Sequence, residues 1–470
     1  MITALAVAAT LAAGMGASHA ASPVKPGTDR VYAPAELVRL VDRARRTPSF
    51  ARQMKLSCST CHVGGFPQLT RFGRLFKLNG YTLSGVPQIV EQLDSLARRS
   101  LELSPIPGLS MAAIVDVTSL NKPLPGASST TADYPQQLSL FFGGEIAPKL
   151  GGLVQLTYSG VSGKLGIDNT DVRYANHTKL GDRDMLFGVT LHNNPTVQDV
   201  WNTVPAWNYP FVSPVLVPRP MASTMIEGGL AQSVLGLGAY ALYDNMLYAE
   251  VSGYTSAPQG PRALADSGAT NTTRNVAPYW RIALQNRHGP GYLMVGAFGL
   301  SADLYPKGAG GASNHYDDVG VDAQAEHDVG KGMLIVRTSW IHEHQGLVAS
   351  FTASPQAARN VTNTLESFRA NAAYAPNRYY SFTLGYFGTS GSSDSRLYAP
   401  AAATGSSTGS PNTEGAIGEL TLNPWLNARI GLQYVMYQRF NGASRSYDVA
   451  SNGRTAQDNN TLLLYTWFAF

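Results

Sequence analysis

The chain of 470 residues contains few charged side chains. Asp, Glu, Lys and Arg make up 14% of it, whereas a soluble globular protein usually has about 25%. Gly (47 residues) and Tyr (23 residues) are abundant. The low charge argues against an ordinary cytoplasmic enzyme, and the aromatic content argues against a disordered protein.

Long apolar runs and basic runs are also missing. After the first twenty residues there is no stretch of about 18 apolar residues, so we expect no membrane-spanning helix. The net charge of +4 is spread along the chain without a Lys/Arg run, so we expect no nucleic-acid partner.

The N-terminus carries an export signature. Residues 2–17 form a short apolar stretch, and Ser18, His19 and Ala20 follow as a small-x-Ala cleavage pattern. This predicts a signal peptide over residues 1–20. Because no Lys or Arg precedes the apolar stretch, either the signal is atypical or the true start lies upstream, and an N-terminal core helix is the alternative.

Cysteine is almost absent, and its two copies define the main chemical motif. Cys58 and Cys61, followed by His62, form C-x-x-C-H, the attachment sequence for c-type haem. Two thiols at this spacing can form thioethers to one porphyrin, and the adjacent imidazole can ligate its iron. A thioredoxin-like redox pair is the alternative, but that chemistry does not need His62.

The residues around the motif predict a small helical domain. Phe72, Leu75 and Phe76 recur at helical spacing before an Asn79-Gly80 stop, and a second helix is expected over residues 87–103. Arg71, Arg74 and Lys77 either meet the haem propionates or form a solvated face. We therefore predict a monohaem c-type cytochrome domain over residues 21–107, too small to enclose its haem without walls from the rest of the chain.

From residue 108 to residue 470 the dominant period is two, with one apolar and one small or polar face. Apolar sets of this kind include Phe187, Val189 and Leu191, then Tyr292, Met294, Phe298 and Leu300, and finally Leu462, Leu464, Phe468 and the terminal Phe470. Apolar faces of this kind suit lipid outside and a wet lumen inside. Sixteen such segments begin near residues 109, 136, 150, 168, 184, 236, 246, 277, 290, 317, 333, 363, 379, 414, 427 and 460.

The connections between these segments alternate in length. Short turns are expected at 146–149, 178–183, 244–245, 287–289, 330–332, 376–378 and 423–426, and long loops at 195–235, 257–276, 389–413 and 441–459. Short periplasmic turns and long outer loops are typical of an outer-membrane barrel. The fold class predicted is an all-β transmembrane barrel of about 16 antiparallel strands, whose lumen is plugged by the cytochrome domain.

Two stretches extend the argument to a family. PSFARQMKLSCSTCHVGGFPQLTRFGRLFKLNGY (residues 48–81) and NNPTVQDVWNTVPAWNYPF (residues 193–211) resemble those of the fused outer-membrane cytochrome-porins of iron-oxidising bacteria. The resemblance extends over nearly the whole mature chain. It implies one covalent haem c, attached at Cys58 and Cys61 and ligated by His62, on a domain that lies in the barrel lumen.

The resemblance also implies a function and partners. Electrons would pass from an extracellular donor, Fe(II) above all, through the haem to a periplasmic c-type cytochrome or cupredoxin. Whether the chain is an Fe(II) oxidase in the enzymatic sense stays open. The alternatives are a haem-plugged diffusion porin and a conduit that carries electrons outward.

The sequence leaves the distal iron ligand open. Met111, His342 and His344 have the parity of lipid-facing residues, and Met54 is too close to Cys58 to reach the opposite haem face. His192 has lumenal parity, but a histidine that caps a loop explains it as well. Carboxylate oxygens suit divalent iron, and an iron site outside the cell could use loop aspartates. The alternative is that these aspartates only keep the loops hydrated. They are Asp303, Asp317, Asp318 and Asp394.

The haem assignment makes a first prediction. Replacing Cys58 and Cys61 together by Ser removes both thioether positions, so the protein should lose its haem signal on a haem-stained denaturing gel. Full signal in the double variant would contradict the assignment.

Overall fold

A computed structural model describes most of the barrel and part of the N-terminal segment. It covers residues 50, 58–63, 67–83, 109–207, 209–215, 217–257, 271–306, 311–425, 427–449, 451 and 453–469. The predicted signal peptide, the predicted helix 87–103, Met54 and Phe470 lie outside the described residues. The predicted domain 21–107 is described only in part.

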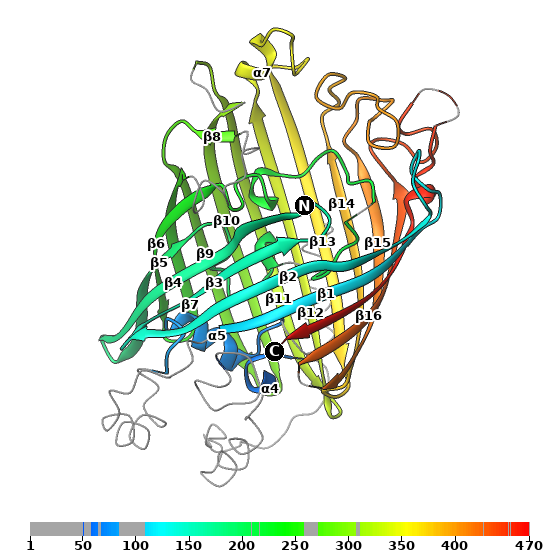
Figure 1. The fold of residues 1–470 in the computed structure, drawn as a ribbon. Coiled ribbons are helices and arrows are strands. Elements are labelled where there is room, and N and C mark those ends of the chain that lie inside the picture. The colour runs from blue at the N-terminus through cyan, green and yellow to red at the C-terminus, as the bar shows by residue number, and fades with distance from the viewer. Residues whose placement is uncertain are drawn as a thin grey trace, which may run out of the picture.

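In the described residues, seventeen antiparallel strands form a single sheet that closes on itself (Figure 1). The strands are β1 (Leu109–Leu120), β2 (Thr130–Ala147), β3 (Leu150–Ser159), β4 (Lys164–Leu180), β5 (Arg183–His192), β6 (Val234–Tyr243), β7 (Leu247–Ser256), β8 (Asn271–Thr273), β9 (Ala277–His288), β10 (Gly291–Pro306), β11 (Asn314–Val329), β12 (Gly332–Gly346), β13 (Thr362–Ala375), β14 (Tyr380–Gly391), β15 (Thr413–Trp425), β16 (Ala428–Arg439) and β17 (Thr461–Ala469). The first strand, β1, pairs with both β2 and β17, which closes the barrel. Because β8 and β9 both pair with β10, they share one position, and the barrel has sixteen positions.

The predicted strands are confirmed. Their starts match to within three residues except at β2, which begins at Thr130 rather than near 136, and β4, which begins at Lys164 rather than near 168. Both strands extend outward into polar sequence, where the alternation of apolar residues that marks a lipid-facing strand is missing. Backbone pairing continues there because a strand ladder does not depend on the side chains being apolar.

Short helices flank the strands. The N-terminal segment contains α4 (Cys58–Cys61) and α5 (Arg71–Leu78), and the loop after β12 contains α7 (Val348–Thr352). Three short 3-10 turns, η1 (Pro205–Trp207), η2 (Met225–Glu227) and η3 (Ala456–Asn459), lie in long loops. Figure 1 shows α5 at the end of the barrel with the short turns and α7 at the opposite end. No helix among the described residues is long and apolar enough to cross a bilayer.

The short turns are tight hairpins. Asp244 and Asn245 between β6 and β7 both have positive φ (51° and 52°), the conformation of a type I′ hairpin. Gly181 and Gly330 also have positive φ, at 62° and 63°. Such turns keep one end of the barrel compact, as the alternating loop lengths predicted.

The outer face of the barrel is apolar. Large side chains that point away from the lumen stay exposed in the isolated chain, among them Leu237, Val251, Leu284, Leu384, Leu462, Leu464 and Phe468. The inner positions of the same strands carry polar or small residues such as Thr190 and Gly238. In a closed antiparallel barrel every strand has a neighbour on both sides, so the backbone N–H and C=O groups find partners within the protein inside a bilayer. The fold is an outer-membrane β-barrel.

The lumen differs from the wet interior predicted for it. Met294, Phe298 and Leu300 on β10, expected on the lipid face, point inward and are buried (0%, 0% and 3% exposed). They pack against the segment between β5 and β6, which was predicted as an outer loop and instead enters the barrel: Val197, Trp201 and Val204 are buried. The apolar side of β10 therefore faces a filled lumen, and both expectations were wrong.

This topology predicts which insertions an antibody can reach. An epitope tag inserted after Thr352, in the exposed loop that carries α7, should be labelled on intact cells. A tag between Asp244 and Asn245 should be labelled only after the outer membrane is permeabilised. The reverse pattern would invert the barrel.

Candidate functional site

The haem motif forms one helical turn. Residues 58–61 are the short helix α4, and His62 follows it and forms an isolated bridge with Leu69. Positions three apart lie on the same side of a helix. The backbone thus places positions 58 and 61 on one side of the turn, directly before His62 in the chain.

The first turn of α5 fixes the motif. The Thr70 backbone N–H donates to the carbonyl oxygen of Cys61 (2.9 Å), and the Thr70 hydroxyl donates to that of Thr60 (2.6 Å). The same hydroxyl accepts the N–H of Gly73 and caps α5. A Cβ at position 73 would overlap the carbonyl oxygen of Cys61, so this close approach requires glycine.

The donor set fits a haem iron. Burial lowers the pKa of His62 to about 4, and hydrogen bonds to the backbone of Gln68 and Pro67 raise it only in part. The imidazole is therefore neutral at neutral pH, the form that ligates metals. Backbone hydrogen bonds to a ligating histidine also fix the orientation of its ring.

Two basic side chains of α5 reach the barrel instead of the motif. The Arg74 guanidinium pairs with Glu326 on β11, donates to the Leu69 carbonyl oxygen (3.2 Å) and lies 4.6 Å from the ring centroid of Tyr292. Lys77 Nζ donates to the carbonyl oxygen of Val197 (2.5 Å). Of the three cations considered as propionate partners, only Arg71 is exposed.

The end of α5 is held by the opposite wall. The Tyr240 hydroxyl donates to the Leu78 carbonyl oxygen (2.6 Å), and the Tyr81 hydroxyl donates to Asp171 Oδ2 (2.7 Å). Gly80, with φ of 69°, turns the chain so close to β4 that a Cβ would lie 2.9 Å from the Arg173 carbonyl oxygen. Helix α5 is thus bound to strands on both sides of the lumen.

The loop between β5 and β6 fills the space above α5. Asp199 organises it, because its carboxylate accepts the backbone N–H groups of Trp201, Thr203 and Val204 (3.0 to 3.1 Å). Buried apolar residues of this loop, of α5 and of the wall form one cluster: Leu78, Leu186, Val200, Trp201, Tyr240, Leu242, Tyr248, Ala283 and Met294.

Helix α5 brings cations into a buried region that holds several other charged side chains. The wall and the loop supply five carboxylates, Asp171, Asp199, Glu250, Asp322 and Glu326, but only three arginines, Arg173, Arg281 and Arg337. Arg74 and Lys77 of α5 enter the same region, where Arg74 pairs with Glu326. Burial, helped by nearby Arg173, lowers the pKa of Lys77 to about 8, so Lys77 is still charged at neutral pH. An unpaired buried carboxylate is costly, and Arg74 of α5 removes that cost for Glu326.

The remaining candidates for the distal haem ligand lie elsewhere. His192 is buried in the lumen, as its parity predicted, and its ring is within hydrogen-bonding distance of the Tyr254 hydroxyl (2.7 Å) and the Thr190 hydroxyl (3.2 Å). As predicted, the strand positions of Met111, His342 and His344 are those that face away from the lumen. The described residues thus supply no further support for any of these as the distal ligand.

The four acids considered for iron do not come together. Asp303 and Asp317 both bond His315 on the outer surface (2.9 and 2.7 Å), whereas Asp318 faces the lumen and accepts the Ile226 N–H (2.6 Å). Asp394 lies in the loop after β14. Among the residues described, no three His, Cys, Asp or Glu side chains are placed to hold a metal ion.

Glu326, Asp171 and the inward loop were not identified from the sequence. The partners Arg74 and Glu326 are 252 residues apart, so no local pattern connects them. One signal was present: on β10 apolar residues occupy both parities, as expected when the lumenal face is covered as well as the lipid face.

Comparison with known proteins supplies no family. No family model and no curated protein matches the chain. Among solved structures, the chain is similar to the anion-selective porin from Comamonas acidovorans (13% identity, TM-score 0.45, 77% of this chain and 98% of that one). It is also similar to the outer membrane channel DcaP of Acinetobacter baumannii (14%, TM-score 0.44, 77% and 96%). Values this low assign no function to the chain.

The Arg74–Glu326 pair generates a prediction about α5. Arg74→Met leaves a carboxylate buried without its partner, which should destabilise the docked state by about 3–5 kcal/mol, whereas Arg74→Met with Glu326→Met should recover most of the loss. The denaturant midpoint in detergent measures both. Arg71→Met, on the exposed side of α5, is the matched control. Equal effects of Arg71→Met and Arg74→Met would contradict the docking.

Proposed function

We propose that this chain is a haem-carrying electron conduit of the outer membrane, related to the cytochrome-porins that its sequence resembles. It accepts electrons from an extracellular donor, Fe(II) above all, and passes them to a periplasmic c-type cytochrome or cupredoxin. The observation that supports this most is the attachment of α5 to the barrel wall. The helix that fixes the C-x-x-C-H turn is itself bound by Glu326 and by the Tyr240 hydroxyl, at the end with short turns.

Each part of the chain has a task in this proposal. Cys58 and Cys61 would hold the haem, and neutral His62 would ligate its iron. The haem, when bound, supplies a centre that takes up and releases one electron. Thr70 and Gly73 keep the motif against α5, and the buried Arg74–Glu326 pair, together with the hydrogen bond from Lys77 to Val197, keeps α5 in the barrel.

The filled lumen has a second consequence. Trp201 and the ion network around Arg281 and Asp322 (2.7 Å) occupy the interior above α5. In this proposal the interior admits electrons but not hydrated iron, which therefore stays outside the cell. Electron transfer of this kind needs neither a nucleophile nor a general base.

A diffusion porin is the second candidate. The observation that favours it is the barrel itself, because sixteen strands leave an aqueous channel when nothing fills the lumen. The buried loop and α5 oppose an open channel, so the two candidates differ in the ion conductance that they predict. A conduit that carries electrons outward has the same structure and differs only in direction.

Rapid mixing of the oxidised protein with Fe(II) tests the proposal. The haem absorbance should change to that of the reduced form without another cofactor, and His62→Ala should abolish or strongly slow this change because the axial ligand is lost. In planar bilayers the wild type should conduct far less than an open porin. High conductance together with a haem that Fe(II) does not reduce would favour the porin.

A further inference from the structure

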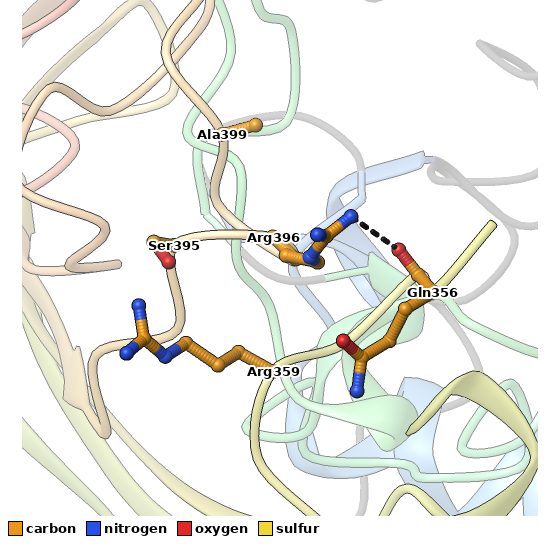
Figure 2. A pocket seen from close by; sticks show the side chains of 5 residues that line it. All are labelled: Gln356, Arg359, Ser395, Arg396 and Ala399. Atoms are coloured by element: carbon orange, nitrogen blue, oxygen red, sulfur yellow. Dashed lines mark hydrogen bonds between the residues drawn. The ribbon is translucent and has the colours of Figure 1, made fainter. Parts of the chain in front are cut away.

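Two outer loops line an open pocket at the end of the barrel opposite α5. The β12–β13 loop contributes Gln356 and Arg359, and the β14–β15 loop contributes Ser395, Arg396 and Ala399 (Figure 2). The pocket has a volume of about 600 Å³, within the range of small-molecule sites. Its lining includes two arginines and no carboxylate.

One buried carboxylate holds the two arginines in place. Asp394 is 1% exposed and accepts the backbone N–H groups of Arg359 and Asn360 from one loop and of Arg396 and Leu397 from the other, all at 3.0 Å. Burial alone would raise the pKa of Asp394, but these N–H donors lower it below its usual value. The carboxylate is therefore charged at neutral pH, and its hydrogen bonds join the two loops.

The guanidinium groups point in different directions around the pocket. Figure 2 shows Arg396 turned toward Gln356, whose carbonyl oxygen accepts a hydrogen bond from Arg396 Nη1 (3.4 Å), and Arg359 extended on the side of Ser395. Within the part of the chain that the structure describes, neither guanidinium has a carboxylate within ion-pair distance. Asp394 lies behind the pocket and uses its oxygens on backbone N–H groups.

We propose that this pocket binds a small extracellular molecule with two or more anionic oxygen groups, such as a polycarboxylate. Arginine forks recognise carboxylates by paired charge-assisted hydrogen bonds. Two forks on separate sides suit a ligand whose anionic groups are separated, rather than a single small anion. The proposal does not depend on the haem. A negatively charged iron complex of a polycarboxylate belongs to the same ligand class.

Calorimetric titration of the full-length protein in a non-ionic detergent tests the site. Citrate is the probe, inorganic phosphate tests a single compact anion, and ferric citrate tests the iron-loaded form. We expect citrate to bind more tightly than phosphate, with an affinity that falls as salt is added. Arg359→Ala with Arg396→Ala should weaken citrate binding about tenfold or more.

Matched variants separate the pocket from general charge effects. Arg274→Ala with Arg445→Ala removes two exposed arginines from other outer loops and should leave citrate binding unchanged. Arg359→Lys with Arg396→Lys keeps the charge without the forks and should bind with intermediate affinity. No citrate binding by the wild type, equal binding by the double alanine variant, or equal loss in the control pair would overturn the proposal. Because the readout is binding, its failure leaves the proposed electron transfer untouched.

Discussion

The absence of water from the hydrocarbon core of a bilayer determines this architecture. Every backbone N–H and C=O in that layer must find a partner within the protein, and sixteen antiparallel strand positions closed by the β1–β17 pairing provide those partners. A barrel of this size has a wide lumen, and an apolar exterior says nothing about what fills it. In this chain the loop between β5 and β6 and the helix α5 fill the lumen next to the short turns.

One buried ion pair and several buried hydrogen bonds attach α5 to the barrel. Arg74 pairs with Glu326 on β11, and Lys77 donates to the carbonyl oxygen of Val197 in the inward loop. The helix that carries these cations is also the one against which the C-x-x-C-H turn is packed, through Thr70 and Gly73. The position of the C-x-x-C-H turn at one end of the barrel therefore follows from these buried contacts of α5.

The sequence predicted the barrel well because the lipid-facing positions of each strand must be apolar, whatever the sequences of the other strands. Each strand alternates by itself, so segments such as β5 and β17 could be recognised one at a time. The helix α5 and its Asn79-Gly80 end were also predictable from local spacing. The filled lumen was not, because Arg74 and Glu326, or Lys77 and Val197, meet only after the barrel closes. On β10 the inward Met294 and Phe298 look like lipid-facing residues until their partners in the inward loop, Trp201 and Val204, are known. The haem motif remains a prediction from Cys58, Cys61 and His62.

The central claim is that electrons cross the outer membrane through this chain. Transfer into closed vesicles tests it most directly: the purified holoprotein is reconstituted into liposomes that contain an oxidised soluble c-type cytochrome, and Fe(II) is added outside. The enclosed cytochrome should become reduced, whereas it should stay oxidised in liposomes with the Cys58→Ser, Cys61→Ser variant. An enclosed cytochrome that stays oxidised with the wild type, while Fe(II) is present outside, would contradict the account.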